Sequence, residues 1–275
     1  MIVVIGGGTM GGGIAVSFVL AGESVRIVEG SDELVQAADG RVRASLVRAA
    51  ERRGRSDEIE ALQKLLHFDT EHRPGGVELV IEAVPEDTAL KQKIFSSIEG
   101  IYDGSTIFGS NTSSLSITEI ASVLERPKRF VGMHFFNPVP ASNLVEIVVG
   151  AETSEATTNR VVELAVLLDK TPIVVQDSPG FASSRLGLTL GLEAIRMVES
   201  GVASAEDIDA AMTLGYKHPI GPLKLTDLVG VDVRLAIAEH LAETLGERFE
   251  PPQLMRDMVA EGKLGEKSGE GFYVW

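Results

Sequence analysis

The chain has 275 residues, more than one small core usually needs, so two domains are expected. It carries 25 Lys and Arg against 40 Asp and Glu, a net charge of −15 that argues against nucleic-acid and membrane partners. The absence of cysteine excludes disulfides, thiol nucleophiles and Cys-ligated metal sites. No apolar run approaches the roughly 20 residues that span a bilayer, and the N-terminus lacks the features of a signal peptide. We therefore expect a cytoplasmic protein.

The first 176 residues alternate short β-branched runs with amphipathic stretches. The expected strands are 2–5, 24–28, 78–84, 105–108, 129–134, 144–149 and 172–175. The expected helices are 10–21, 32–53, 88–99, 117–124 and 155–169. This alternation predicts an α/β fold, a Rossmann-like, doubly wound parallel sheet covered by helices.

The pattern changes at Pro179-Gly180, after which helical periodicity replaces the strand signal. Helices are expected over 181–200, 204–214 and 225–245. Ser204 with Asp207 has the spacing of a capping box, as Ser116 with Glu119 does earlier in the chain. We predict a Rossmann-like NAD-binding domain over 1–178 and a smaller all-helical C-terminal domain over 179–275.

A glycine-rich segment directly follows the first expected strand and opens the first helix. Its sequence matches G-x-G-x-x-G and comprises Gly6, Gly7, Gly8, Thr9, Met10 and Gly11. Such a turn brings backbone N–H groups and a helix N-terminus to a pyrophosphate. Glu29, 18 residues after Gly11, ends the second expected strand, where a carboxylate binds a ribose diol and repels a 2′-phosphate. These features favour NAD over NADP, with flavin as the alternative.

One of the five histidines stands out as a candidate base for hydride chemistry. His67, His72, His218 and His240 lie in polar, turn or helical contexts that suit structural or solvated residues. His134 ends an expected strand, and a proline-rich loop leads from it to the strand that carries Glu146. A hairpin would place this carboxylate beside the imidazole. Spacing alone leaves open whether the pair is catalytic or a structural ion pair.

Several motifs, taken in chain order, resemble those of the L-3-hydroxyacyl-CoA dehydrogenases, and most closely the single-function bacterial type that acts on 3-hydroxybutyryl-CoA. They are Ser110-Asn111-Thr112-Ser113-Ser114-Leu115, His134-Phe135-Phe136-Asn137-Pro138, Leu144-Val145-Glu146, Asp177-Ser178-Pro179-Gly180-Phe181 and Gly269-Glu270-Gly271-Phe272-Tyr273. The resemblance covers essentially the whole chain. It implies an NAD-dependent oxidoreductase of fatty acid metabolism (β-oxidation) that interconverts 3-hydroxyacyl-CoA and 3-ketoacyl-CoA, and a homodimer formed through the helical domain.

The resemblance also implies roles for particular residues. His134 is expected to be the general base, with Glu146 as its support and Ser113 as the hydroxyl that holds the substrate oxygen. The implied NAD contacts are Gly6, Gly7, Gly8, Thr9, Met10, Gly11, Glu29, Glu86, Lys91, Ser113, Asn137 and Lys267. The implied substrate contacts are Ser45, Arg52, Ser113, Asn137 and Ser184. Ser184 departs from the family pattern, which often has Asn before this Arg185.

A basic segment interrupts the acidic sequence between residues 41 and 55. Its arginines are Arg41, Arg43, Arg48, Arg52, Arg53 and Arg55, opposed only by Glu51. A solvated helix face would account for it, but an arginine cluster would also attract the phosphates of coenzyme A to a repulsive protein. The resemblance points to the second interpretation.

Two other functions remain as alternatives. A relative of the same fold could act on a hydroxy acid such as gulonate, although it would have no use for the basic segment. A non-catalytic NAD-binding protein of the crystallin kind could retain the fold, although it would not need His134 and Glu146.

Overall fold

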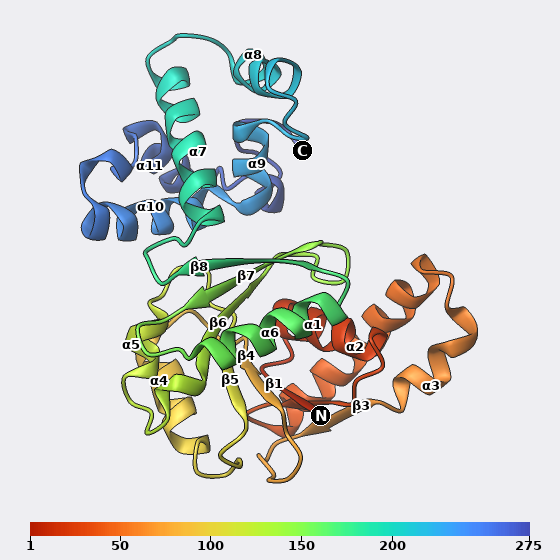
Figure 1. The fold of residues 1–275 in the computed structure, drawn as a ribbon. Helices are drawn as coiled ribbons and strands as arrows, with labels where there is room; N and C mark the ends of the chain where they lie inside the picture. The colour runs from red at the N-terminus through yellow and green to blue at the C-terminus, as the bar shows by residue number, and fades with distance from the viewer. The chain divides into compact units, whose positions relative to one another are not determined.

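The computed structural model describes all residues from 1 to 275 and divides into two compact units, Met1–Ser178 and Pro179–Trp275. The first unit contains every strand of the sheet, and the second is helical (Figure 1). No helix in the protein is both long enough and apolar enough to cross a bilayer.

The first unit is built on one eight-stranded sheet with the order β3-β2-β1-β4-β5-β6-β7-β8. Its strands are β1 (Ile2–Ile5), β2 (Val25–Val28), β3 (Leu66–Asp69), β4 (Leu79–Glu82), β5 (Ile107–Ser110), β6 (Phe130–Phe135), β7 (Leu144–Val149) and β8 (Thr171–Gln176). All neighbours run parallel except β6 and β7, which form an antiparallel pair. The predicted Rossmann-like α/β fold is confirmed, with this one hairpin inserted in the parallel sheet.

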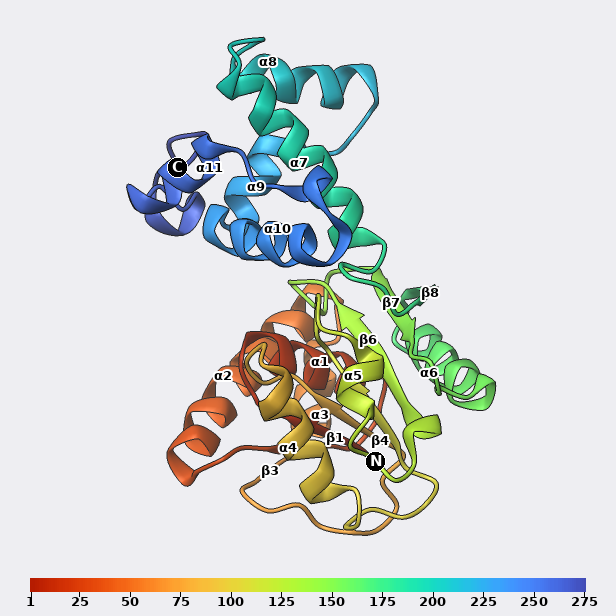
Figure 2. The same cartoon turned by 90° about the vertical axis from the view of Figure 1, so that its left-hand side faces the viewer.

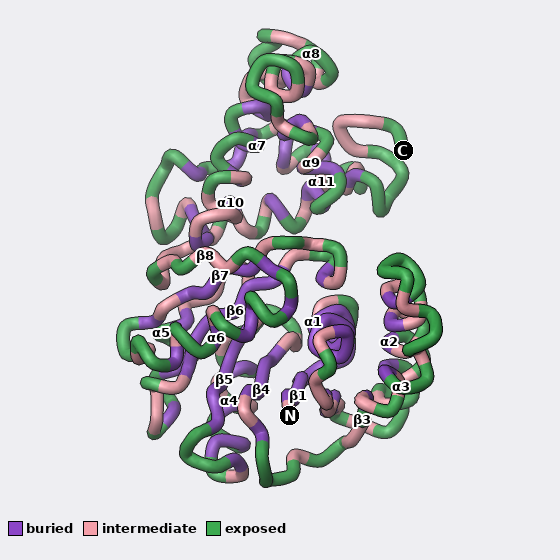
Figure 3. Tube along the Cα trace, turned by 45° about the vertical axis from the view of Figure 1, so that its right-hand side comes forward, coloured by how far each residue is buried: buried purple, intermediate pink, exposed green.

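Helices cover both faces of the sheet. They are α1 (Thr9–Leu20), α2 (Asp32–Arg52), α3 (Ile59–Gln63), α4 (Thr88–Ile98), α5 (Ile117–Ala121) and α6 (Glu155–Leu167), with short 3₁₀ turns η1 (Ser56–Glu58) and η2 (Pro127–Arg129). Buried residues of α1, α2 and α6 share one core with one face of the strands. Phe95 of α4 stacks edge-on against Phe108 and Phe130 from β5 and β6. In Figure 3 the central strands and α1 are mostly buried, whereas β8 and the outer sides of α2 and α3 are more exposed.

The second unit is a small helical domain with its own core. Its helices are α7 (Ser183–Glu199), α8 (Ala205–Ala210), α9 (Pro222–Val229), α10 (Val231–Leu245) and α11 (Gln253–Ala260). A π-helical segment, η3 (Ala211–Gly215), continues from α8, and η4 (Glu247–Phe249) and η5 (Glu266–Ser268) are short 3₁₀ turns. Leu192, Leu223, Val231, Leu241 and Met255 lie fully or almost fully buried at its centre. Figure 2 shows α8 beside the C-terminal end of α7, away from α10.

One predicted element needs correction, and three elements were not predicted. The segment expected to be one helix over 225–245 is two helices, because Gly230 has φ +105° and ends α9 before α10 begins. Strand β3 and helix α3 were not predicted, since each has only four or five residues and little periodicity to detect. Helix α11 was missed as well. Ser116 and Ser204 cap their helices as the sequence suggests, because their Oγ atoms accept hydrogen bonds from the Glu119 and Asp207 N–H groups.

Candidate active site

The glycine-rich turn between β1 and α1 is shaped by close backbone contacts. Gly6 has φ +87°, and a Cβ built on Gly11 would lie 1.8 Å from the Gly6 carbonyl oxygen, so no side chain fits there. A Cβ on Gly8, the N-cap of α1, would meet no atom within 4 Å. The turn is therefore tight on the sheet side and open at the helix N-terminus. This shape suits an approaching pyrophosphate group.

Glu29 is held against this turn at the end of β2. Its Oε1 accepts a hydrogen bond of 2.6 Å from the Gly7 N–H. The Gly7 carbonyl in turn accepts from Arg41 Nη2 at 2.8 Å. The carboxylate is half-buried and is followed by the exposed Gly30, which offers no cation for a 2′-phosphate. These residues fit the adenosine ribose of NAD.

The β6–β7 hairpin brings His134 and Glu146 together, as their spacing predicts. The two residues are direct cross-strand partners in the antiparallel register. His134 Nδ1 lies 2.7 Å from Glu146 Oε2, and the Glu146 side chain is fully buried. The Phe136 ring lies tilted over the imidazole, with 4.5 Å between ring centroids. A buried carboxylate in this position fixes the ring orientation and would stabilise an imidazolium.

Glu86 accepts hydrogen bonds from several groups at the start of the loop after β5. It accepts hydrogen bonds from Thr112 Oγ1 at 2.5 Å and from the Ser113 N–H at 2.9 Å. Burial alone would raise the pKa of Glu86, but the charge of Lys91 and these hydrogen bonds outweigh it, and the pKa lies below its ordinary value. An ionised Glu86 therefore sets the position of Ser113, whose Oγ also lies 3.4 Å from the carboxylate.

Lys91 is buried and paired with carboxylates, whereas a side chain that binds the cofactor directly would be exposed. Its side chain is 1% exposed, and its Nζ lies 2.6 Å from Glu82 Oε1 and 3.3 Å from Glu86 Oε2. Glu82, fully buried at the end of β4, also accepts from Ser110 Oγ at 2.7 Å. Lys91 thus ties Glu86 to the sheet. Glu82 was missed at the sequence level, although an acidic residue inside the expected strand 78–84 was a visible signal.

The remaining implied contacts are Asn137, Ser184 and Lys267. Asn137 is exposed in the loop after β6. Ser184 and Lys267 belong to the second unit, where Lys267 Nζ pairs with Asp232 Oδ1 of α10 at 2.6 Å. Ser184 lies in the first turn of α7 and is half-buried.

The six arginines of the basic segment have different surroundings, so they do not form one cluster. Arg41 binds the Gly7 carbonyl, and Arg43 forms a 2.5 Å ion pair with Asp39. Arg55 forms an ion pair with Glu58 and donates to the Leu20 carbonyl at 2.6 Å. These three arginines hold the fold together. For Arg41, Arg43 and Arg55, the expectation that the basic segment attracts an anion is wrong. Composition shows that arginines are present but not which partner each guanidinium contacts.

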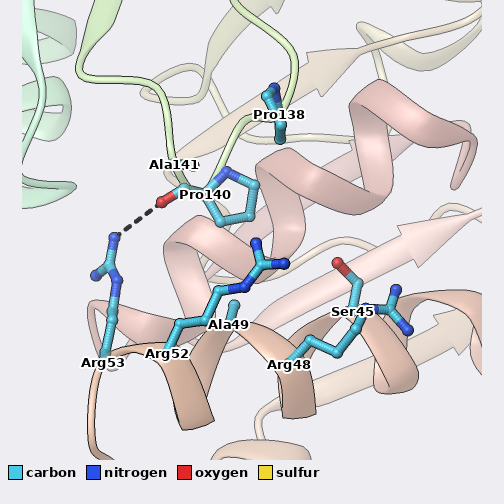
Figure 4. Close-up of a pocket in the computed structure, with 8 residues that line it drawn as sticks. All are labelled: Ser45, Arg48, Ala49, Arg52, Arg53, Pro138, Pro140 and Ala141. Carbon is cyan, nitrogen blue, oxygen red and sulfur yellow. Dashed lines mark hydrogen bonds between the residues drawn. The ribbon is translucent and has the colours of Figure 1, made fainter.

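The other three arginines lie along one pocket of about 370 Å³ between α2 and the loop after β6. Figure 4 shows its lining residues, which are Ser45, Arg48, Ala49, Arg52, Arg53, Pro138, Pro140 and Ala141. Arg53 Nη2 donates to the Pro140 carbonyl at 3.2 Å. Arg48 and Arg52 are exposed and form no ion pair or hydrogen bond within the protein. Their charge is available to an anion from solution.

Comparisons with known proteins cover both units. The family descriptions "3-hydroxyacyl-CoA dehydrogenase, NAD binding domain" and "3-hydroxyacyl-CoA dehydrogenase, C-terminal domain" match residues 1–178 and 180–275. A probable 3-hydroxybutyryl-CoA dehydrogenase of Bacillus subtilis is 43% identical over 275 residues, covering 99% of this chain and 96% of the relative. The mitochondrial hydroxyacyl-coenzyme A dehydrogenase of Mus musculus is 39% identical over 284 residues, covering 100% and 90%.

A solved structure of a 3-hydroxybutyryl-CoA dehydrogenase also has the same fold as this chain. The crystal structure of an (S)-3-hydroxybutyryl-CoA dehydrogenase from Ralstonia eutropha superimposes with a TM-score of 0.92 at 41% identity, covering 100% of this chain and 98% of that one. The matched NAD-binding domain contains the glycine turn and Glu29 described above, and NAD is the cofactor. The chain is an NAD-dependent oxidoreductase that belongs to the 3-hydroxyacyl-CoA dehydrogenase family.

Proposed function

We propose that the protein interconverts 3-hydroxyacyl-CoA and 3-ketoacyl-CoA, with His134 as the general base. The observation that carries this proposal is the buried contact of 2.7 Å between His134 Nδ1 and Glu146 Oε2. With Nδ1 bonded to the carboxylate, Nε2 is the atom that exchanges a proton with the substrate hydroxyl. Glu146 then stabilises the imidazolium that forms.

The redox half of the reaction depends on the residues around the glycine turn. Bound NAD supplies the acceptor, or as NADH the donor, of the hydride at C3. The N–H groups of residues 6–11 hold the pyrophosphate and Glu29 holds the ribose. Glu86 and Ser113 orient the nicotinamide end, while Lys91 acts through Glu86. We assign Lys267 to the same cofactor on the resemblance alone.

The substrate is a coenzyme A thioester because the pocket beside α2 suits an anion with several phosphates. Arg48 and Arg52 carry charges that no carboxylate of this acidic protein neutralises. Ser45, on the same helix, adds a hydroxyl to the pocket. A guanidinium binds phosphate through paired hydrogen bonds, which makes arginine a suitable residue here. An enzyme for a free hydroxy acid such as gulonate would gain nothing from this pocket.

Three further residues are assigned to the acyl end. Ser113 and Asn137 hold the C3 oxygen, and Ser184 binds nearer the end of the acyl chain. A serine hydroxyl reaches less far than the asparagine common in the family.

We propose that the protein is a homodimer formed through the second unit, whose Leu186 and Leu190 on α7 are exposed apolar side chains. Light scattering on the purified protein measures this directly.

The experiment that tests the function follows NADH consumption with acetoacetyl-CoA and with the pantetheine thioester of acetoacetate. We expect turnover with both and a markedly lower KM for the CoA thioester, because only that substrate carries the nucleotide phosphates. Turnover of a free hydroxy acid without turnover of acetoacetyl-CoA would overturn the proposal in favour of the gulonate-type reaction. Binding of NADH without turnover of either would support a non-catalytic protein.

A further inference from the structure

A buried lysine lies beneath the loop that connects the two strands of the hairpin. Lys170, just before β8, is 6% exposed. Its Nζ donates to the Val139 carbonyl at 2.7 Å and to the Ser142 carbonyl at 2.6 Å. The Phe135 ring centroid lies 6.0 Å from the same nitrogen. No carboxylate contacts this cation, although buried ammonium groups normally have one. Its partners are two carbonyls of one loop.

This loop, residues 136–142, lies next to three parts of the proposed site: His134, the arginine-lined pocket and helix α1. It begins two residues after His134 and contains Asn137. Pro138, Pro140 and Ala141 form one wall of the arginine-lined pocket. On the other side Val139 packs on α1: a Cβ built on Gly13 would lie 2.9 Å from the Val139 Cβ. The loop therefore forms a wall of the pocket on one side, while Val139 packs on the cofactor-binding helix on the other.

Backbone contacts alone do not fix this loop. The Ala141 and Ser142 N–H groups both donate to the Pro138 carbonyl, which closes a turn but does not attach it to the sheet. Besides the packing of Val139 on α1, hydrogen bonds attach the loop to other elements through two cations: Arg53 on the Pro140 carbonyl, and Lys170 on the carbonyls of Val139 and Ser142. Arg53 is exposed and lies on the pocket, whereas Lys170 is enclosed.

We propose that Lys170 is a positioning residue for the coenzyme A thioester: its ammonium group fixes the loop 136–142 and so the wall of the pocket opposite Arg48 and Arg52. This inference rests on the proposed function. It assigns a role in substrate binding to a residue that touches neither substrate nor cofactor.

The electrostatic surroundings support the assignment. Burial and, to a smaller extent, the charge of Arg53 lower the pKa of Lys170 to about 8. Asp169 Oδ2 lies 4.0 Å from Arg53 Nη1, and its side chain is exposed, so it offsets little of this repulsion. Phosphate groups bound beside Arg53 would reduce the repulsion between the two cations. Binding of the thioester and the charge of Lys170 therefore favour each other.

The absence of cysteine from the chain allows a test at the level of single atoms. In Lys170→Cys the new thiol is unique, and it can be alkylated in denaturant before refolding. Aminoethylation rebuilds a side chain of lysine length with its ammonium group, whereas propylation gives the same shape without charge. Wild-type protein taken through the same steps controls for refolding.

We expect the propylated protein to have a KM for acetoacetyl-CoA raised about tenfold, the equivalent of one charge-assisted hydrogen bond. The aminoethylated protein should stay within about twofold of wild type, by the same measure. In both, kcat and the KM for NADH should change much less. The KM of the propylated protein for the pantetheine thioester should also change little, because that substrate does not reach the arginines.

Equal KM values for acetoacetyl-CoA in the two alkylated proteins would overturn the inference. So would an equal loss for the CoA and pantetheine thioesters, which would indicate a general structural role. Neither result contradicts the proposed reaction, which is overturned instead if the wild-type protein does not reduce acetoacetyl-CoA. Lys170→Met, measured without refolding, provides an independent check, and Lys93→Met on the exposed side of α4 is its matched control.

Discussion

Basic side chains occur in two contrasting settings in the first unit. At the carboxyl ends of the strands, His134 and Lys91 each have a buried carboxylate within 2.7 Å. Along α2, Arg48 and Arg52 lie at a pocket with no carboxylate partner, in a protein of net charge −15. Basic groups paired with a carboxylate inside the protein hold reacting groups in place, whereas unpaired charges beside a pocket are available for a ligand. The predictions below test this difference.

The largest effect is expected from Glu146→Gln. A glutamine cannot stabilise an imidazolium, and its amide N–H₂ can favour the tautomer that leaves the proton on Nε2. We expect kcat to fall by about 10²- to 10⁴-fold, as when a neutral amide replaces the carboxylate of a catalytic triad. The measurement is steady-state kinetics with acetoacetyl-CoA. Unchanged turnover would make the buried pair a structural one.

Lys91→Met should mainly affect stability. It leaves the fully buried carboxylate of Glu82 without its cation, with only Ser110 Oγ and the Val84 N–H as donors. Removing one partner of a buried pair costs about 3–5 kcal/mol. Urea unfolding measures the loss. The control Lys64→Met breaks the exposed pair with Glu60, for which about 0–1 kcal/mol is expected.

Arg52→Glu tests the unpaired side of the comparison. Replacing an attractive charge by a repulsive one should raise the KM for acetoacetyl-CoA about tenfold or more, and added salt should weaken binding further. The KM for NADH should stay nearly constant. Lys93→Glu makes the same change of charge on α4, on the other face of the sheet, and should leave both constants unaltered. If Arg52→Glu behaves like this control, the arginines are only a solvated helix face.

A smaller effect is expected at Glu29. Glu29→Ala removes the acceptor of the Gly7 N–H and the charge that repels a 2′-phosphate. NADH should bind several-fold more weakly, and the preference for NADH over NADPH should shrink. Titration of protein fluorescence with both cofactors measures these changes. Equal wild-type efficiency with NADH and NADPH would contradict the role given to Glu29.

The same contrast shows what could be predicted from the sequence. The pairing of His134 with Glu146 was predictable because strand register follows from backbone periodicity, and β7 has the expected bounds Leu144–Val149. The contacts that each arginine side chain makes were not predictable. Whether a long flexible side chain turns back to a carbonyl, as Arg41 does, or lies along a pocket, as Arg52 does, depends on tertiary neighbours far away in the sequence.

The buried contacts of lysines escaped prediction for the same reason. Lys170 and Lys91 look like ordinary surface residues in the sequence, and only the packing of distant segments encloses them. The break at Gly230 was missed because apolar periodicity continues through it. Only the positive φ of this glycine separates the two helices.

The central claim is that His134 exchanges the substrate proton. The most direct test measures kcat of His134→Ala with acetoacetyl-CoA, together with the affinity of the same sample for NADH. The account predicts a loss of about 10²- to 10⁴-fold in kcat with NADH binding retained, because the imidazole acts on the substrate hydroxyl and not on the dinucleotide. Near wild-type turnover in His134→Ala would contradict it.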